Sequence, residues 1–227
     1  METLTLKKID REELLGLNPY FVGLQSDTQS ELARAFMETS FERDSLIISE
    51  GQAGAGLAFM ASGAAKWSKF SVDGKEQILS IIRPGDAFND APTFDGGPSS
   101  GDVVALSQAI VYVLPEADVM RFLGKTDFSK NTAKVLARRL REMVRLVEDL
   151  SFRRVTGRLA RIILEELDGQ AHLTQRDMAA MAGTAREVIG RSLKELGDEG
   201  IIKIENHRII IKDRQGLRGK LSLDDQE

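Results

Sequence analysis

The chain has 227 residues, of which 42% are hydrophobic and 29% are charged, values typical of a folded globular protein rather than a disordered or fibrous one. It contains no cysteine, which excludes disulfides, thiolate metal sites and cysteine-ligated iron–sulfur clusters. No apolar run approaches the ~20 residues needed to cross a bilayer, and the first ten residues do not resemble a secretion signal. We therefore expect a cytoplasmic protein without a membrane anchor.

The formal net charge of −4 is unevenly distributed. Residues 1–130 carry a net charge of −7 and residues 131–227 a net charge of +3. An acidic chain with one basic region is consistent with nucleic-acid binding by that region, although basic helix faces are often only solvated. The length favours two domains.

The first half of the chain has the pattern of a β-rich domain preceded by a helix. Residues 26–39 predict a short helix, with apolar Leu32 and Phe36. Short apolar runs separated by glycine turns then predict a sandwich or barrel. Asp73-Gly74 is the strongest hairpin signal, because glycine tolerates the positive φ of tight turns. The expected strands are residues 46–48, 57–60, 64–72, 77–82, 103–106 and 109–114.

After Pro115 the hydrophobic period changes from 2 to about 3.6 residues, which predicts helices. Residues 132–150 form an amphipathic helix whose apolar positions alternate by three and four, the spacing of a coiled-coil seam. The stripe alone does not distinguish packing on its own domain from a dimer seam. The expected seam residues are Ala133, Leu136, Leu140, Met143, Val147 and Leu150.

Residues 158–213 predict three helices followed by a β-hairpin. Thr174 can cap the second helix, with Asp177 at its third position. Gly183-Thr184 interrupts the helical pattern before a third helix, and the predicted strands 201–205 and 208–212 flank an Asn206-His207 turn. Two helices joined by a short glycine-containing turn and closed by a hairpin describe a winged helix-turn-helix.

The third helix has one apolar and one polar face. Ile189, Leu193 and Leu196 lie toward a core, whereas Arg186, Glu187, Gly190 and Arg191 share the opposite face. Arginine can donate two hydrogen bonds to guanine O6 and N7, and glutamate can accept one from cytosine N4. Arg186, Glu187 and Arg191 are therefore the base-reading candidates. An ordinary surface ion pair between Glu187 and Arg191 is the alternative.

The stretch from Leu173 to Ile204 resembles the DNA-binding domain of the Crp/Fnr family, whose recognition helix carries an R-E-x-x-x-R core matched by Arg186, Glu187 and Arg191. The resemblance covers nearly the whole chain. It implies an α+β fold: an N-terminal double-stranded β-helix (jelly-roll or β-roll) sensor domain at 1–125, a dimerisation helix at 126–152, and a winged helix-turn-helix domain at 153–227. It further implies a homodimer on a palindromic operator with TGTGA-like half-sites, acting with RNA polymerase. Candidates for contacts to the DNA backbone are Thr174, Gln175, Arg176, Thr184, His207 and Arg208.

In cyclic-nucleotide-binding relatives a Gly-Glu pair and an Arg-Ser pair hold the ligand. The corresponding effector-pocket candidates here are Asn89, Asp90, Ser100 and Gly101. No arginine stands in these positions and Asp90 adds a negative charge, so we expect a pocket without the cation that cyclic AMP requires. Trp67 and Phe70 could line a cavity, although strand aromatics are more often core.

Other familiar signals also lack their ligands. Iron–sulfur sensing needs cysteine, and both histidines, His172 and His207, fall in the DNA-binding part, where haem ligation is not expected. A different small molecule, a partner protein or no effector remains. No nucleophile–base pair, metal cluster or phosphate-binding glycine loop stands out, so we predict neither an enzyme nor a cofactor. A ligand-binding regulatory protein that no longer reads a specific operator is the alternative function.

Overall fold

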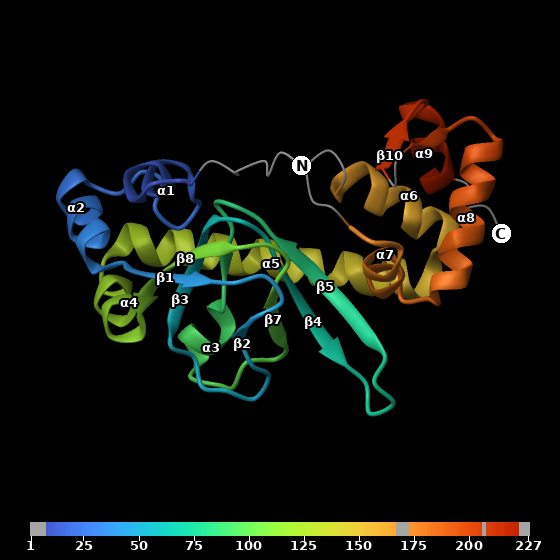
Figure 1. The fold of residues 1–227 in the computed structure, drawn as a ribbon. Coiled ribbons are helices and arrows are strands. Elements are labelled where there is room, and N and C mark those ends of the chain that lie inside the picture. The colour runs from blue at the N-terminus through green and yellow to red at the C-terminus, as the bar shows by residue number, and fades with distance from the viewer. Residues whose placement is uncertain (1–7, 167–172, 206–207, 223–227) are drawn as a thin grey trace. The chain divides into compact units, whose positions relative to one another are not determined.

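The computed structural model describes residues 8–166, 173–205 and 208–222. The chain divides into two compact units, one made of residues 1–69 and 80–141 and the other of residues 70–79 and 142–227 (Figure 1). Within the described residues, every helix is too short or too polar to span a lipid bilayer.

The first unit is built on a β-roll of two four-stranded sheets, ordered β1-β8-β3-β6 and β2-β7-β4-β5. Ala58, Met60 and Val111 are buried between residues of both sheets, whereas Phe59 and Tyr112 pack against helices on the other face. β3 is buried on both faces for this reason, and so its sequence is continuously apolar. The strands are β1 (Met37–Phe41), β2 (Leu46–Ile48), β3 (Gly56–Ser62), β4 (Ala65–Phe70), β5 (Glu76–Ile82), β6 (Ala87–Phe88), β7 (Asp102–Ala105) and β8 (Ala109–Pro115).

The prediction of one helix over residues 26–39 is wrong at its C-terminal end. Helix α2 (Ser26–Ala35) stops at Phe36, which is extended and buried, and residues 37–41 instead form β1. β1 pairs antiparallel with β8, with Met37 opposite Val113. Pairing with a strand about 70 residues away, which is a tertiary interaction, therefore overrides the local helical pattern.

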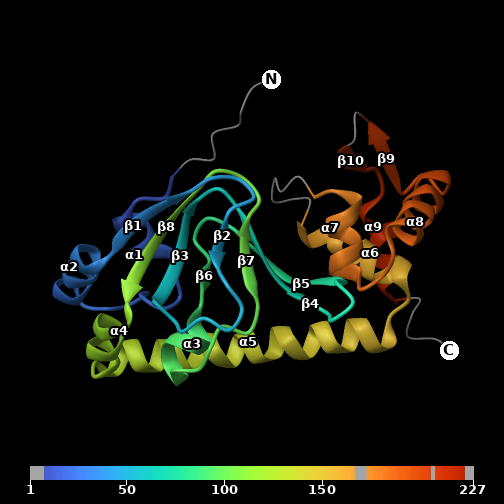
Figure 2. The same cartoon turned by 60° about the horizontal axis from the view of Figure 1, so that its bottom comes forward.

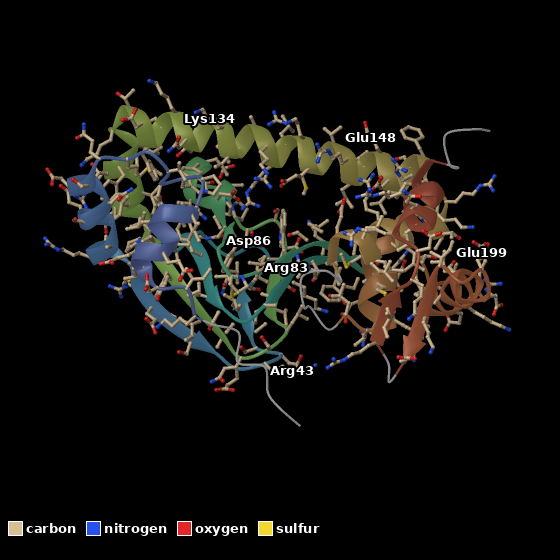
Figure 3. The ribbon with its side chains drawn as sticks, turned by 90° about the horizontal axis from the view of Figure 1, so that it is seen from above. Arg43, Arg83, Asp86, Lys134, Glu148 and Glu199 are labelled. Carbon is tan, nitrogen blue, oxygen red and sulfur yellow. The ribbon has the colours of Figure 1, made fainter. Side chains whose placement is uncertain are left out.

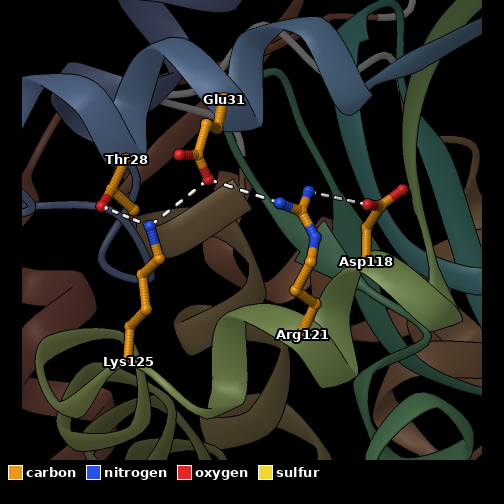
Figure 4. Close-up of polar contacts among 5 residues, drawn as sticks. All are labelled: Thr28, Glu31, Asp118, Arg121 and Lys125. Atoms are coloured by element: carbon orange, nitrogen blue, oxygen red, sulfur yellow. Dashed lines mark hydrogen bonds and ion pairs between the residues drawn. The ribbon is translucent and has the colours of Figure 1, made fainter.

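Two short helices of this unit were not predicted, α1 (Arg11–Leu17) and α3 (Asp90–Asp95). Helix α4 (Glu116–Leu123) begins directly after Pro115, where the hydrophobic period changes, although no bounds were predicted for it. A polar cluster joins α2 to α4 (Figure 4). Glu31 accepts hydrogen bonds from Arg121 at 3.4 Å and Lys125 at 3.3 Å, and Lys125 also donates to the Thr28 hydroxyl at 3.0 Å. Because these side chains are about half exposed, the ion pairs of the cluster contribute little to stability.

Helix α5 (Thr126–Phe152) has 27 residues. It extends beyond the amphipathic stretch of residues 132–150 at both ends, and its bounds are those that the resemblance implies for the long helix. It lies beside α3 in the first unit (Figure 2). The predicted β4–β5 turn is also present, with Gly74 at φ 76°.

The second unit contains the predicted helix-helix-helix-hairpin order (Figure 1). Its elements are α6 (Val155–Glu166), α7 (Gln175–Ala182), α8 (Arg186–Asp198), β9 (Ile202–Glu205), β10 (Arg208–Ile211) and α9 (Arg214–Ser222). One apolar core joins α6, α7, α8 and the hairpin, with Leu159, Ile163 and Leu193 buried in it. α9 was not predicted, and Leu217 anchors it in the same core.

A buried carboxylate organises the junction between α5 and α6. Asp149 accepts a hydrogen bond from Arg153 Nε at 2.7 Å and forms an ion pair with Arg161 at 3.0 Å. Arg153 also donates to the backbone carbonyl of Leu221 in α9, at 2.7 Å. The cluster therefore holds three helices of the second unit together.

Candidate nucleic-acid interface and sensor cavity

Local capping positions the two helices of the helix-turn-helix. Thr174 accepts a hydrogen bond from the Asp177 backbone N–H at 3.1 Å, and Asp177 accepts one from the Thr174 backbone N–H at 2.9 Å, so the predicted capping box is present. Gly183 ends α7 in the left-handed conformation, with φ 64°. A side chain there would be strained, which explains glycine at the turn.

The faces of α8 are as predicted. Ile189, Leu193 and Leu196 are buried in the core, while the side chains of Arg186, Glu187 and Arg191 are exposed. The packing of the apolar face fixes the rotation of the helix, so the two arginines and the glutamate point to solvent together. The exposed set provides ten N–H donors and one carboxylate at the N-terminal half of one helix, which suits hydrogen bonding to base edges in a major groove.

The backbone-contact candidates differ in how free their side chains are. Gln175 and Arg176 are exposed at the start of α7, and Gln175 Oε1 lies 3.9 Å from the position that a Cβ on Gly190 would take. The Thr174 hydroxyl already bonds the Asp177 carboxylate at 2.6 Å. Thr184 is half-buried and its backbone N–H bonds the Ala179 carbonyl, whereas Arg208 is exposed at the start of β10. His207 lies outside the described residues.

The exposed apolar stripe of α5 only partly coincides with the expected seam. Ala133, Leu140 and Val147 are exposed, Leu140 to 67%, but Leu136, Met143 and Leu150 are half-buried in their own chain. Exposed Ala137 and Val144 complete the stripe. Its members, spaced four, three, four and three residues apart, are Ala133, Ala137, Leu140, Val144 and Val147, which we call the α5 stripe.

A cavity of about 60 Å³ lies in the first unit, between strands of the β-roll, α3 and α5. The predicted Asn89, Asp90 and Ser100 line it, as does Trp67. Gly101 does not line it: a Cβ there would lie 2.6 Å from the Ser68 carbonyl oxygen, so glycine is required by close backbone packing. The remaining lining residues are Ile48, Ser80, Ile82, Phe88, Ala91, Pro92, Ser99, Val103 and Arg139.

The expectation of a cavity without a cation is wrong. Arg139 of α5 reaches the cavity and forms an ion pair with Asp90 at the start of α3. The same guanidinium donates to the backbone carbonyl of Ala87, and the buried Tyr20 hydroxyl donates to Asp90 at 3.2 Å. Burial and the Asp90 charge raise the pKa of Tyr20 well above its ordinary value, so its hydroxyl remains a neutral donor.

The turn that precedes β6 holds another carboxylate, that of the exposed Asp86. The Asp86 carboxylate accepts a hydrogen bond from the Arg83 backbone N–H at 2.8 Å, and both residues are labelled in Figure 3. Partial desolvation of the carboxylate by neighbouring atoms raises the pKa of Asp86, and this hydrogen bond together with the charges of Arg83 and Arg139 partly opposes the rise. Among the residues that the structure describes, no group of three potential metal ligands occurs.

Both parts of the chain match known protein families. Residues 38–126 match the family model of the cyclic nucleotide-binding domain, and residues 157–219 match that of the Crp-like helix-turn-helix domain. The chain belongs to the Crp/Fnr family of transcription regulators.

Relatives of this Crp/Fnr chain align over most of its length. It is 28% identical over 219 residues to the CRP-like cAMP-activated global transcriptional regulator of Mycobacterium tuberculosis, covering 91% of this chain and 97% of that protein. It is 29% identical to the cyclic AMP receptor protein of Thermus thermophilus, covering 82% and 89%. FixK2 of Bradyrhizobium japonicum has the same fold, with a TM-score of 0.74 at 22% identity over 81% of this chain and 96% of FixK2.

The place of Arg139 in the cavity of this Crp/Fnr protein could not be predicted from the sequence. The polar faces of the predicted helix carry several arginines, and the helical period alone does not show which of them faces the β-roll. The half-buried positions of the observed helix identify that side, and Arg139 is one of them.

Proposed function

We propose that this protein is a homodimeric transcription regulator that binds a palindromic operator with TGTGA-like half-sites in the cytoplasm and acts with RNA polymerase. The observation that carries the proposal is the exposed Arg186, Glu187 and Arg191 face of α8, held over a buried apolar face. This face presents the R-E-x-x-x-R core within a Crp-like helix-turn-helix domain. The proposed domain limits are 1–125, 126–152 and 153–227.

The α5 stripe supports the proposed dimer. Leu140, Val144 and Val147 are 67%, 50% and 61% exposed in the single chain, and a second copy of α5 would cover them. A two-fold dimer would place two α8 helices in successive major grooves, about 34 Å apart. We therefore propose the α5 stripe as the seam. It keeps three residues of the expected set, and Ala137 and Val144 take the place of the half-buried Leu136, Met143 and Leu150.

The sensor domain is proposed not to be adapted to cyclic AMP, an iron–sulfur cluster or histidine-ligated haem. The chain has no cysteine, and Asp90 neutralises the Arg139 charge in the cavity. The cAMP-activated relatives share the fold, so the sensed signal is a property of these side chains and not of the β-roll as such.

Fluorescence anisotropy tests operator binding. The full-length protein is expected to bind a TGTGA palindrome more tightly than a scrambled duplex of equal length. Arg191→Ala should cost about 1–3 kcal/mol of discrimination at one base pair, because a bidentate contact to that base is lost. Exposed Arg34 of α2 offers a matched control, since Arg34→Ala removes the same charge far along the chain from α8.

Equal affinity of the wild-type protein for the palindrome and the scrambled duplex would favour the alternative, a ligand-binding regulatory protein without sequence-specific recognition. Arg176→Ala completes the design, because loss of a phosphate contact is expected to weaken binding to all sequences alike.

A further inference from the structure

The cavity of the β-roll contains its own ion pair. Of the residues that line it, Arg139 is the cation and Asp90 the anion, and they bind each other. The Asp90 side chain is 12% exposed and that of Arg139 is 31% exposed. The pair is therefore largely shielded from solvent, and the charges of the lining sum to zero.

Both partners of the pair are held by further contacts. Arg139 also donates to the Ala87 carbonyl, and Asp90 also accepts from the Tyr20 hydroxyl. The Tyr20 ring is packed edge-on against Phe59, with centroids 6.2 Å apart, and stacked on Phe94, with centroids 6.0 Å apart. Tyr20 of the N-terminal segment thus holds Asp90 in place, and the Ala87 carbonyl of β6 holds Arg139. The pair is therefore part of the folded unit.

This arrangement opposes an anionic ligand. A phosphodiester that bound Arg139 would have to separate it from Asp90 and would leave a buried carboxylate beside a second negative charge. The cavity volume of about 60 Å³ is also well below the roughly 300–1,000 Å³ of typical ligand pockets. A cyclic nucleotide would have to displace the pair to enter.

The pair joins the same elements that a bound ligand would bridge. Asp90 begins α3 and Arg139 lies in the middle of α5, which continues along the chain toward the DNA-binding helices. A ligand favours one conformation by binding it more tightly than others, and an internal contact present in that conformation does the same without a ligand. We propose that the Asp90–Arg139 pair is a built-in substitute for an anionic effector and makes operator binding independent of cyclic nucleotide. The inference rests on the proposed operator binding for one of its two readouts.

Trp67 provides the other readout, because it lines the cavity and is the single tryptophan of the chain. Millimolar cAMP added to the full-length wild-type protein is expected to change neither the Trp67 emission spectrum nor the affinity for the TGTGA palindrome. A shift in Trp67 emission together with tighter operator binding would overturn the proposal. Trp67 emission is measured without DNA, so it tests the cavity even if the operator proposal fails.

Variants test the pair itself. Arg139→Gln and the near-isosteric Asp90→Asn are each expected to shift Trp67 emission to longer wavelength and to lower operator affinity about tenfold, within the usual range of coupling between sites. Arg145→Gln removes an exposed arginine from the same helix and is expected to change neither readout. If Arg139→Gln does not fold by circular dichroism, Asp90→Asn carries the comparison. Wild-type emission and wild-type affinity in the folded variants would show that the pair has no such role.

Discussion

Leu140→Asp tests the proposed seam directly, because Leu140 is more exposed than Val144 and Val147, the other large side chains of the α5 stripe. Full burial of a leucine side chain contributes about 1.5–3 kcal/mol, and with 67% of the residue exposed in the single chain about 1–2 kcal/mol remains to be gained in a dimer. The two-fold relation doubles this to about 2–4 kcal/mol, which corresponds to a dimer dissociation constant about 30- to 700-fold higher. Two carboxylates facing each other across the seam would add to the loss.

Sedimentation velocity over a range of protein concentrations measures the effect. The variant is expected to sediment as a folded monomer where the wild-type protein is a dimer, since little of the Leu140 side chain is buried in its own chain. Val72→Asp is the matched control, because Val72 is fully exposed in the β4–β5 turn and lies outside the α5 stripe. A Leu140→Asp protein that dimerises as tightly as the wild type would refute the seam.

Three further substitutions have defined outcomes. Gly190→Ala is expected to stabilise α8 by about 0.5–1 kcal/mol in thermal unfolding, since the added methyl group would meet nothing closer than 3.9 Å. The same methyl group adds bulk to the recognition face and should weaken operator binding measured by anisotropy. Unchanged binding would argue against DNA contact at this position. Asp149→Ala should lower the free energy of unfolding by about 3 kcal/mol in urea titration, because it leaves the largely buried Arg153 and Arg161 without their carboxylate. A loss below about 1 kcal/mol would contradict this expectation. Asp86→Asn should raise the melting temperature at pH 7. Because the folded-state pKa of Asp86 is raised, the wild-type protein gains stability from this group only as the pH falls through that pKa. The advantage of the variant over the wild type should therefore shrink in acid. A difference that does not depend on pH would refute the assignment to Asp86.

The helix-turn-helix could be predicted in detail because its signals are local. The Thr174–Asp177 capping box, the glycine at 183 and the period of Ile189, Leu193 and Leu196 all lie within a few residues of the features they determine. Hydrogen bonds of a cap and the rotation of an amphipathic helix follow from such short-range spacing. The exposed face of α8 therefore follows from the sequence without knowledge of the rest of the chain.

The β-roll could be predicted only as a set of strands. The glycine turns marked most strands, but the register of β1 on β8 depends on a partner 70 residues away, and a local helical pattern wrongly extended over it. Strand pairing depends on the tertiary structure, so the sequence of a single strand does not predict which strand pairs with it.

The exposed helix face that carries Arg186, Glu187 and Arg191 was thus determined by the sequence itself, because periodicity and caps act within one helix. The α5 stripe and the Asp90–Arg139 pair were decided only by the tertiary structure. Which side of α5 meets the β-roll depends on packing between elements far apart in the chain, and that packing turns Arg139 into the cavity and leaves Leu140, the next residue, exposed.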